Sequence, residues 1–398
     1  MTNKIEFKNI TKQYGNKYAV NNVDLQIEEG EFVCFIGTSG SGKTTMMRMI
    51  NRMVKETSGQ ILIGGKDISK LNEVILRRSI GYVIQQIGLM PHMTIYENIV
   101  MVPKLLKWED QKMRAVAENL MNKVDLPLDL LDAYPSELSG GMQQRIGVIR
   151  ALAADQDIIL MDEPFGALDP ITRDSLQQLI KKLQKDMNKT IVFVTHDMDE
   201  ALNLADKIVI MHDAKIVQQG SPKDILTDPI NDYVKGLIGD ERLSQAIFEY
   251  ESVEKIMIQP IKVHQNTTIQ QVANRMSVTR VDDILVVDDN DVLVGRVDLR
   301  TLSERHFPQT PVKHVMKKVT FVLNDTTIRD AIYYIQDLGY RNLSVVNREG
   351  KLLGLVTRSG IVSTVYDAYW KNYEPEVEPI VTSDESLASA AVEVSDSL

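Results

Sequence analysis

Eight consecutive residues near the N-terminus combine glycines, a lysine and a threonine in an order that suits phosphate binding. Residues 37–44 read GTSGSGKT and match G-x-x-x-x-G-K-[ST], between the apolar run EFVCFIG and the helical run TTMMRMINRM. The glycines let backbone N–H groups converge on a phosphate, and the helix N-terminus adds its positive end. Lys43 can reach β- and γ-phosphates, while the Thr44 hydroxyl can bind Mg²⁺. The residues predicted to contact the nucleotide here are Gly37, Ser39, Gly40, Ser41, Gly42, Lys43, Thr44 and Thr45.

Polar side chains follow three further apolar runs, each typical of a buried parallel strand. The run IILM ends in Asp162 and Glu163, where Asp162 can hold the metal through a water and Glu163 can polarise an attacking water. Paired acids at a strand end can also simply cap the next helix. The run IVFV ends at His196, which we expect at the γ-phosphate or the water, and Gln85 after GYVI is a further predicted Mg²⁺ ligand.

Two residues near these motifs have simpler interpretations. Tyr14 can stack on a base, although ordinary surface packing explains it equally well. Cys34, the single cysteine, is expected to be a small buried side chain and cannot form a disulfide within the chain.

Composition restricts the class of protein. The chain has 398 residues, 43% hydrophobic and 25% charged, which is typical of a folded protein of two or three domains. A net charge of −10 argues against nucleic acid as a partner. The N-terminus lacks the apolar core of a signal peptide, and no run of about 18 apolar residues predicts a membrane span. Any membrane role is therefore expected to need a partner.

The pattern of the chain changes after about residue 245, where an internal repeat begins. Met257 matches Met316, Gly295 matches Gly354, and further pairs share the same separation of 59 residues (316 less 257). The repeat predicts two β-α-β-β-α units. Residues 372–398 carry acids but no lysine or arginine, which predicts a disordered acidic tail that is either solubilising or regulatory.

The arrangement of motifs resembles ATP-binding cassette (ABC) ATPases. Residues 138–145, LSGGMQQR, resemble the signature motif of that family, and residues 167–169 resemble its D-loop. Gln85, His196 and Tyr14 occupy the positions of its Q-loop glutamine, switch histidine and adenine-stacking aromatic. One departure is Thr38, where many importers of the family have Pro, and we expect little effect of it. The resemblance covers residues 1–240 and implies an α/β P-loop domain with an inserted helical subdomain at about 88–150.

The resemblance also implies a dimeric mechanism. In the family, the signature face of one cassette closes on the ATP held by a second one, so we expect a second copy of the chain as partner. The residues that this implies at the opposite ATP are Ser139, Gly140, Gly141, Gln143 and Asp169.

The repeat resembles a pair of α+β CBS modules, at residues 253–310 and 311–371, after a linker at 241–252. One cassette followed by two such modules resembles the ATPase subunits of glycine betaine/carnitine/choline importers. The resemblance implies a separate membrane permease, a substrate-binding protein and a place on the cytoplasmic face of the membrane. An importer ATPase for another solute such as an amino acid, a soluble ABC ATPase, and a nucleotide sensor without turnover are the alternatives.

The ligand of the CBS pair is less determined. Many CBS modules hold ribose with an Asp three residues after a Thr, but here Gly360 follows Thr357, and Asp298 and Thr301 occupy the matching places in the first module. Arg358 and Tyr340 remain as candidate phosphate and base contacts. Related importers make two kinds of regulation plausible: cyclic di-AMP binding at the interface of CBS pairs from two chains, which would inhibit uptake, and sensing of ionic strength near anionic lipid. Dimerisation alone also stays open.

Overall fold

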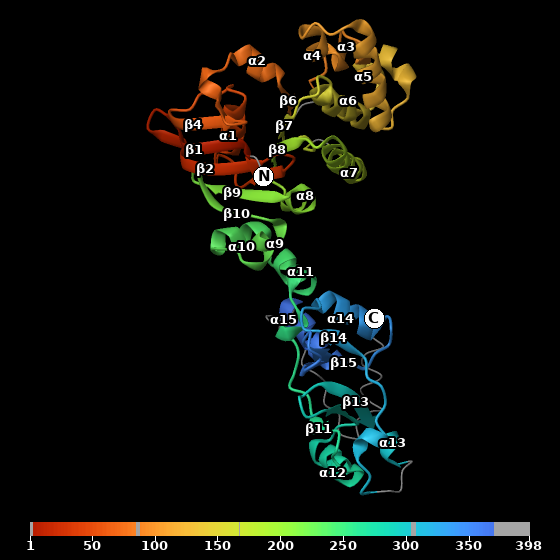
Figure 1. Ribbon diagram of the computed structural model, residues 1–398. Helices are drawn as coiled ribbons and strands as arrows, with labels where there is room; N and C mark the ends of the chain where they lie inside the picture. Colours follow the sequence, from red (N-terminus) through yellow and green to blue (C-terminus); the bar gives the residue numbers. More distant parts are fainter. Residues whose placement is uncertain (1–2, 85–87, 167, 304–307, 370–398) are drawn as a thin grey trace, which may run out of the picture. The chain divides into compact units, whose positions relative to one another are not determined.

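The computed structural model describes residues 3–84, 88–166, 168–303 and 308–369 (Figure 1). The chain divides into two compact units, Met1–Ala246 and Ile247–Leu398. The predicted metal ligand Gln85 and the predicted acidic tail lie outside the described residues.

The first unit contains a six-stranded sheet in the order β10-β9-β3-β8-β7-β6. β10 runs antiparallel to β9, whereas the other neighbours pair in parallel. Every residue of β3, β7 and β8 is buried, as their apolar runs predict. Because these three strands are adjacent and parallel, the residues that follow them meet at one edge of the sheet. The strands are β3 (Phe32–Ile36), β6 (Ile80–Val83), β7 (Ile158–Asp162), β8 (Thr190–Val194), β9 (Lys207–His212) and β10 (Lys215–Gly220).

Helices cover this sheet through two different apolar cores. Alternate residues of β3 point to opposite faces, so Cys34 packs in the core shared with α6 (Gly140–Leu152) and α7 (Pro170–Met187). Val33 packs in the other core with Met46 of α1 (Lys43–Ile50). Burial raises the pKa of the Cys34 thiol well above its usual value. Cys34 is therefore the small buried side chain that we expected.

A second sheet extends the core around α1. Its order is β2-β1-β4-β5, with antiparallel pairing throughout. Apolar residues of β1, β2 and β4 join the core that holds Met46. The strands are β1 (Asn3–Tyr14), β2 (Lys17–Glu28), β4 (Ser58–Ile63) and β5 (Lys66–Asp67).

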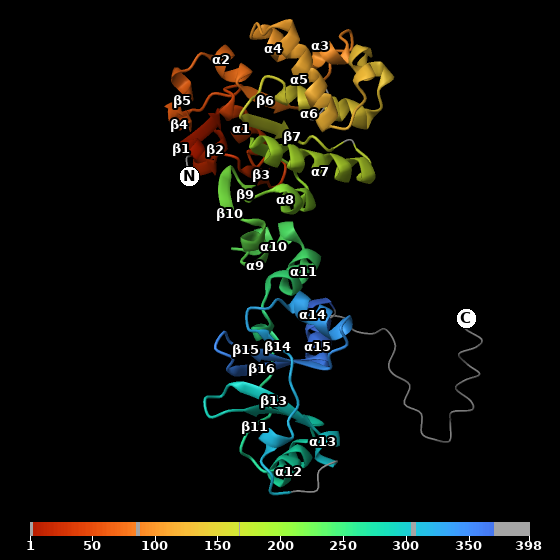
Figure 2. The ribbon, with the colours of Figure 1, turned by 45° about the vertical axis from the view of Figure 1, so that its right-hand side comes forward.

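Residues 88–150 are helical and contain no strand, as predicted. Figure 2 shows the longer helices of this part gathered in one cluster beside β6 and β7. α3 begins with a capping box between Thr94 and Glu97. The elements are α3 (Ile95–Ile99), α4 (Met101–Leu105), α5 (Asp110–Lys123), the 3₁₀ turns η2 (Leu128–Asp132) and η3 (Pro135–Glu137), and α6.

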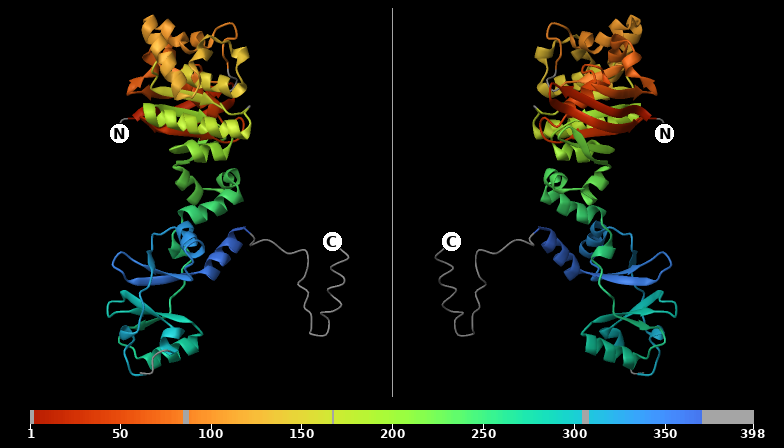
Figure 3. Two further views of the ribbon diagram at one scale, coloured as in Figure 1. Left: turned by 90° about the vertical axis from the view of Figure 1, so that its right-hand side faces the viewer. Right: turned by 90° about the vertical axis from the view of Figure 1, so that its left-hand side faces the viewer.

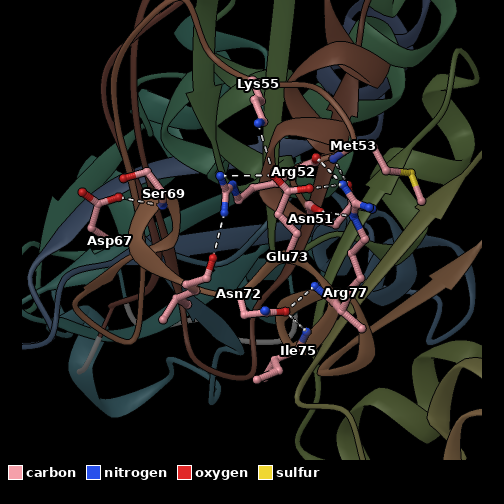
Figure 4. A network of polar contacts seen from close by, with 12 residues as sticks. Asn51, Arg52, Met53, Lys55, Asp67, Ser69, Asn72, Glu73, Ile75 and Arg77 are labelled. Carbon is pink, nitrogen blue, oxygen red and sulfur yellow. Dashed lines mark hydrogen bonds and ion pairs between the residues drawn. The ribbon is translucent and has the colours of Figure 1, made fainter. Parts of the chain in front are cut away.

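An ion-pair network joins the end of α1 to α2 (Glu73–Arg78), as Figure 4 shows. The Glu73 carboxylate lies 3.3 Å from both Arg52 and Lys55 and 3.1 Å from Arg77. Arg77 also donates to the carbonyl of Arg52 at 2.8 Å. A short 3₁₀ turn, η1 (Ile68–Lys70), precedes α2. The network fixes α2 immediately before β6.

Short helices form the last part of the first unit. They are α8 (Met198–Leu204), α9 (Pro222–Thr227), α10 (Asp232–Ile238) and α11 (Asp240–Tyr250), whose last turn extends beyond Ala246. Residues 241–252, which we expected to be a linker, are thus mostly helix. Over the described residues, none of the helices combines the length and apolarity that a bilayer crossing requires.

The second unit consists of the two predicted β-α-β-β-α repeats, each with a three-stranded sheet. Figure 3 shows the two sheets beside each other, and Leu285, Val287 and Leu352 form a shared apolar cluster. The first repeat comprises β11 (Lys262–His264), α12 (Ile269–Thr279), β12 (Asp283–Val287), β13 (Leu293–Asp298) and α13 (Leu299–Ser303). The second repeat comprises β14 (Phe321–Leu323), α14 (Ile328–Gln336), β15 (Asn342–Val346), β16 (Leu352–Thr357) and α15 (Arg358–Tyr369).

The segments that precede the repeats are exchanged between them. Residues around the turn η4 (Val253–Lys255) pack in the core of the second repeat, and Met257 lies against Gly354. Residues around η5 (Val312–His314) pack in the core of the first repeat, and Met316 lies against Gly295. Each repeat's core is therefore completed by a segment that, when the two repeats are aligned in sequence, belongs to the other repeat.

Candidate active site

The loop between β3 and α1 has the backbone shape that its glycines predict. Gly40 and Gly42 have φ angles of 80° and 107°, which L side chains rarely adopt. A Cβ at Gly37 would collide with the carbonyl of Met211, and one at Gly42 would collide with the carbonyl of Ala19. The loop is thus held between β9 and β2, and only glycine fits at these two contacts.

Lys43 starts α1 and is almost completely buried. Its ammonium donates to the carbonyls of Gly37 at 2.8 Å and Thr38 at 3.0 Å, which leaves one of its three protons for a phosphate. Burial lowers the pKa of Lys43, and the carboxylates of Glu163 and Asp162 oppose that shift. The buried Ser41 hydroxyl has no hydrogen-bond partner. An anion in the loop would satisfy both groups.

Asp162, at the end of β7, faces the first turns of α1. The Thr44 hydroxyl donates to one Asp162 oxygen at 3.2 Å, and Arg48 Nη2 lies 3.2 Å from the other. The Tyr82 hydroxyl is also close, at 3.5 Å. A hydroxyl and a carboxylate side by side are the oxygen donors that Mg²⁺ prefers, so the predicted pair Thr44 and Asp162 fits this ion.

Glu163 and His196 meet across the same edge of the sheet. The His196 Nδ1 atom lies 3.5 Å from the Glu163 carboxylate. Glu163 has a φ of 45°, and its backbone N–H donates to the Val194 carbonyl at 3.0 Å. The His196 side chain is 69% exposed, so it is free to face a ligand. A cavity of about 410 Å³ lies here, lined by Ala19, Ser39, Gly40, Gly42, Lys43, Thr44, Thr45, Glu163 and His196.

Tyr14 is not among the residues that line this cavity. Its ring is 54% exposed at the end of β1, and the Lys12 ammonium lies 4.6 Å above it. The structure therefore shows an available aromatic face, and base stacking by Tyr14 stays a prediction.

The residues expected at an opposite ATP lie outside the cavity and cap two helices. The Ser139 hydroxyl accepts the Met142 N–H at the start of α6, and the exposed Gly140 and the half-buried Gly141 follow it. Asp169 caps α7 by accepting the Thr172 N–H at 3.1 Å, which lowers the Asp169 pKa.

Gln143, the fifth of these residues, has a structural partner. Its amide donates to the carbonyls of Pro135 at 2.9 Å and Leu138 at 3.0 Å. Gln143 thus holds the turn that presents Ser139.

Sequence reasoning missed two neighbours of the site. Arg48 pairs with Asp162, and the signal was its position four residues after Thr44, which places both on one face of α1. Ala19 lines the cavity through a contact between sheets, for which the sequence contains no periodic signal.

The two repeats of the second unit enclose a second cavity. It measures about 640 Å³, and we call it the arginine cleft because Arg280, Arg341 and Arg358 line it. All three arginines are exposed, and Arg341 pairs with Asp282 at 2.8 Å. Tyr340 instead lines an adjoining cavity of about 260 Å³, which shares Arg341 and Asp283 with the cleft. The two predicted ligand contacts, Arg358 and Tyr340, therefore line two adjoining cavities rather than one.

Comparison with known families and proteins agrees with this division of the chain. The ABC transporter family model matches residues 20–166, and the CBS domain model matches residues 253–305 and 312–367. The chain is 52% identical to the carnitine transport ATP-binding protein OpuCA of Listeria monocytogenes, over 94% of this chain and 95% of that protein. It is 50% identical to the glycine betaine/carnitine/choline transport ATP-binding protein OpuCA of Bacillus subtilis, over 94% of this chain and all of that protein.

Among solved structures, the chain is similar to the dimeric structure of MJ0796, a bacterial ABC transporter cassette. The TM-score is 0.50 and the identity 38%, over 55% of this chain and 98% of that one.

Proposed function

The chain belongs to the family of ABC transporter ATP-binding proteins that carry a CBS pair, and on this premise we propose that it energises import of a quaternary-amine osmoprotectant. Glycine betaine, carnitine and choline are the candidate solutes, because transport proteins for them are similar to this chain over its nucleotide unit and its repeats alike. The observation that carries the proposal is the joint presence of the phosphate loop, the Glu163–His196 pair and both repeats in one chain. Family membership makes the chain an ATPase.

The polar side chains of the cavity have roles in ATP hydrolysis. Lys43 and the loop N–H groups bind the phosphates, and Ser39, Ser41 and Thr45 complete the cradle. Thr44 and Asp162, with Gln85, would hold Mg²⁺, which neutralises charge on the phosphates when bound. Glu163 orients the attacking water and accepts its proton, and His196 contacts the γ-phosphate side of the site. Tyr14 would stack on the adenine ring.

A second copy of the chain is needed to complete each site. Ser139, Gly140 and Gly141 lie at the start of α6, outside the cavity of their own chain. Their N–H groups and the helix end form a surface suited to an anion supplied by a partner. We therefore expect two equivalent ATP sites between two chains, with Gln143 and Asp169 fixing the two caps.

The membrane permease is expected to contact residues 88–98, next to Gln85. The buried Asn98 amide donates to the carbonyls of Met90 at 3.1 Å and Thr94 at 2.9 Å, so this segment has a defined shape. Met90 nevertheless stays 39% exposed and offers an apolar contact. A separate substrate-binding protein would deliver the solute, and the chain would lie on the cytoplasmic face of the membrane.

Uptake by the reconstituted complex tests the proposed function. The complex with its co-purifying permease would be placed in vesicles, and ATP-dependent uptake of labelled glycine betaine would be measured at low and high internal salt. Glu163→Gln should still bind ATP but lose at least about 100-fold in turnover, because the general base is removed. Uptake should be lost with it.

The outcomes separate the alternatives. Hydrolysis without uptake of any quaternary amine would contradict the proposed solute class and favour another solute such as an amino acid. Hydrolysis by a chain that co-purifies with no membrane protein would favour a soluble ABC ATPase. Turnover that persists in Glu163→Gln would contradict the role of Glu163.

We further propose that the arginine cleft binds cyclic di-AMP and that binding inhibits uptake. Three exposed arginines suit two phosphates, and the cleft has the volume for a nucleotide ligand. Calorimetric titration of the full-length chain with cyclic di-AMP tests this. A titration without heat and without a thermal shift would contradict it, and a salt response of uptake would then favour sensing of ionic strength. If the chain showed neither cyclic di-AMP binding nor a salt response of uptake, a role of the repeats in dimerisation alone would be favoured.

A further inference from the structure

Tyr233, near the start of α10, contacts the phosphate loop from a distant part of the sequence. The backbone N–H of Thr38 donates to the Tyr233 hydroxyl at 3.3 Å. The hydroxyl in turn donates to the carbonyl of Met211 at 3.3 Å. One hydroxyl can make both bonds because it has one proton and free lone pairs. Tyr233 therefore bridges the loop and the end of β9.

The position of this hydroxyl is set by packing on the ring and on the helix. The His212 ring stacks on the Tyr233 ring, with centroids 3.9 Å apart and an interplanar angle of 26°. The next residue, Val234, is fully buried and anchors α10 in the core that contains Cys34. The hydroxyl is thus held in place when no nucleotide is present.

The peptide that Tyr233 holds is the same one that holds Lys43. The Thr38 N–H and the Gly37 carbonyl belong to one planar peptide unit. That carbonyl accepts the Lys43 ammonium at 2.8 Å. Gly37 also lies directly against the Met211 carbonyl. The Tyr233 hydroxyl therefore lies where three backbone groups meet: the Thr38 N–H, the Gly37 carbonyl and the Met211 carbonyl.

We propose that Tyr233 is a positioning residue of the ATP site, which holds the Gly37–Thr38 peptide so that Lys43 is aimed at the phosphates. The proposal rests on ATP binding at this loop, the core of the proposed function. It also gives Thr38 a role, because proline at this position would have no N–H to donate. The placement of α10 thereby affects the affinity of the loop for ATP.

A Tyr233→Phe variant of the full-length chain, assembled with its permease, tests the proposal. The change removes the hydroxyl and keeps the ring, so the stack on His212 remains. We expect the KM for ATP to rise about three- to tenfold, with kcat changed less than about twofold, because a hydrogen bond that positions the ground-state contact is lost.

The background at Thr38 makes the test specific to this bond. In a Thr38→Ala chain, which keeps the N–H, Tyr233→Phe should raise KM by the same factor as in the parent. In a Thr38→Pro chain, Tyr233→Phe should change KM no further, because the donor is already absent. Equal effects in both backgrounds would overturn the proposal.

Two controls keep the result interpretable. Tyr333→Phe removes a hydroxyl from an exposed ring of the second repeat and should leave KM unchanged. Thermal unfolding shows whether each variant is folded. If the Thr38→Pro chain does not fold, the single Tyr233→Phe variant still tests the proposal, because an unchanged KM for ATP would overturn it. A parent complex without ATP hydrolysis would contradict the proposed function instead, and calorimetric ATP binding, which needs no turnover, would then decide the role of Tyr233.

Discussion

Strands β12 and β13 of the first repeat pair in the same register as β15 and β16 of the second. Asp283 pairs with Asp298 as Asn342 pairs with Thr357, and the later pairs match in the same way. The two repeats differ where their last strands meet the following helices. There the first repeat has Asp298, whose carboxylate pairs with Lys317 at 3.0 Å, while the second has Thr357.

The end of the second repeat that has Thr357 lines the arginine cleft. Ile258 stands 59 residues before Lys317 and is its counterpart in the other repeat. Ile258 lines the arginine cleft, and its apolar side chain forms no ion pair across it. Thr357 accepts the Gly360 N–H at 3.0 Å, so it caps α15 without a charge. The comparison teaches that a duplicated frame can be kept while one of its two ends lines a cleft and the other is closed by an ion pair.

The exchanged methionines give the largest expected difference between the repeats. A Cβ added at Gly354 would overlap the Met257 side chain, including the Cβ atom of Met257. A Cβ added at Gly295 would come nearest to the Met316 sulfur, at 2.9 Å. Gly354→Ala should therefore destabilise the second unit by about 2 kcal/mol, and Gly295→Ala by less. Denaturant unfolding of the full-length chain measures both.

A double variant sharpens this prediction. Adding Met257→Ala to Gly354→Ala removes the overlap with the Met257 sulfur and Cγ and leaves only the contact with its Cβ. The two changes together should therefore cost less than their sum. Strict additivity would show that Met257 and Gly354 do not press on each other.

Ligand binding by the arginines of the two neighbouring cavities gives the next largest expected effect. Arg358→Ala should weaken cyclic di-AMP binding about tenfold, because a charge-assisted contact to a phosphate is lost. Arg296→Ala, in the smaller cavity, is the matched control and should change affinity less than about twofold. The reverse order of effects would place the ligand in the smaller cavity.

The helix caps at the ends of the repeats should differ in their response to pH. The Thr301 hydrogen bonds and Lys317 hold the pKa of Asp298 well below its usual value. The stabilisation from Asp298 is therefore full above the unfolded pKa of about 4 and is lost as pH falls toward the folded value.

Alanine substitutions at these caps give the smallest expected effect. Asp298→Ala should cost about 1 kcal/mol at pH 7 and less at pH 3, while the cost of Thr357→Ala should stay constant. Unfolding measured at both pH values checks this. A cost of Asp298→Ala that does not change with pH would contradict the role of its charge.

Local patterns predicted the elements that hold the ATP site. The apolar runs at β3, β7 and β8 form buried parallel strands, and Lys43, Glu163 and His196 meet at their shared edge. This worked because the carboxyl ends of parallel strands face the same way, so strand order alone brings the residues together. The repeat likewise predicted the secondary structure of the second unit.

Contacts between distant segments were not predictable. Tyr233 meets Thr38 across 195 positions, and no spacing in the sequence indicates that a side chain of α10 reaches the loop. The exchange of Met257 and Met316 was hidden for the same reason, since aligned repeats look self-contained. Tertiary packing, rather than periodicity, decides such contacts.

The exchange of residues 253–257 and 312–316 has a consequence for synthesis of the chain. As the polypeptide leaves the ribosome, the first repeat lacks Val312 and Met316 until translation has passed beyond it. Val253 and Met257 must wait longer, until Gly354 has emerged. A nascent chain stopped between the repeats exposes apolar surface from both cores and becomes a target for chaperones and proteases. Quality control thus acts on the pair as a whole.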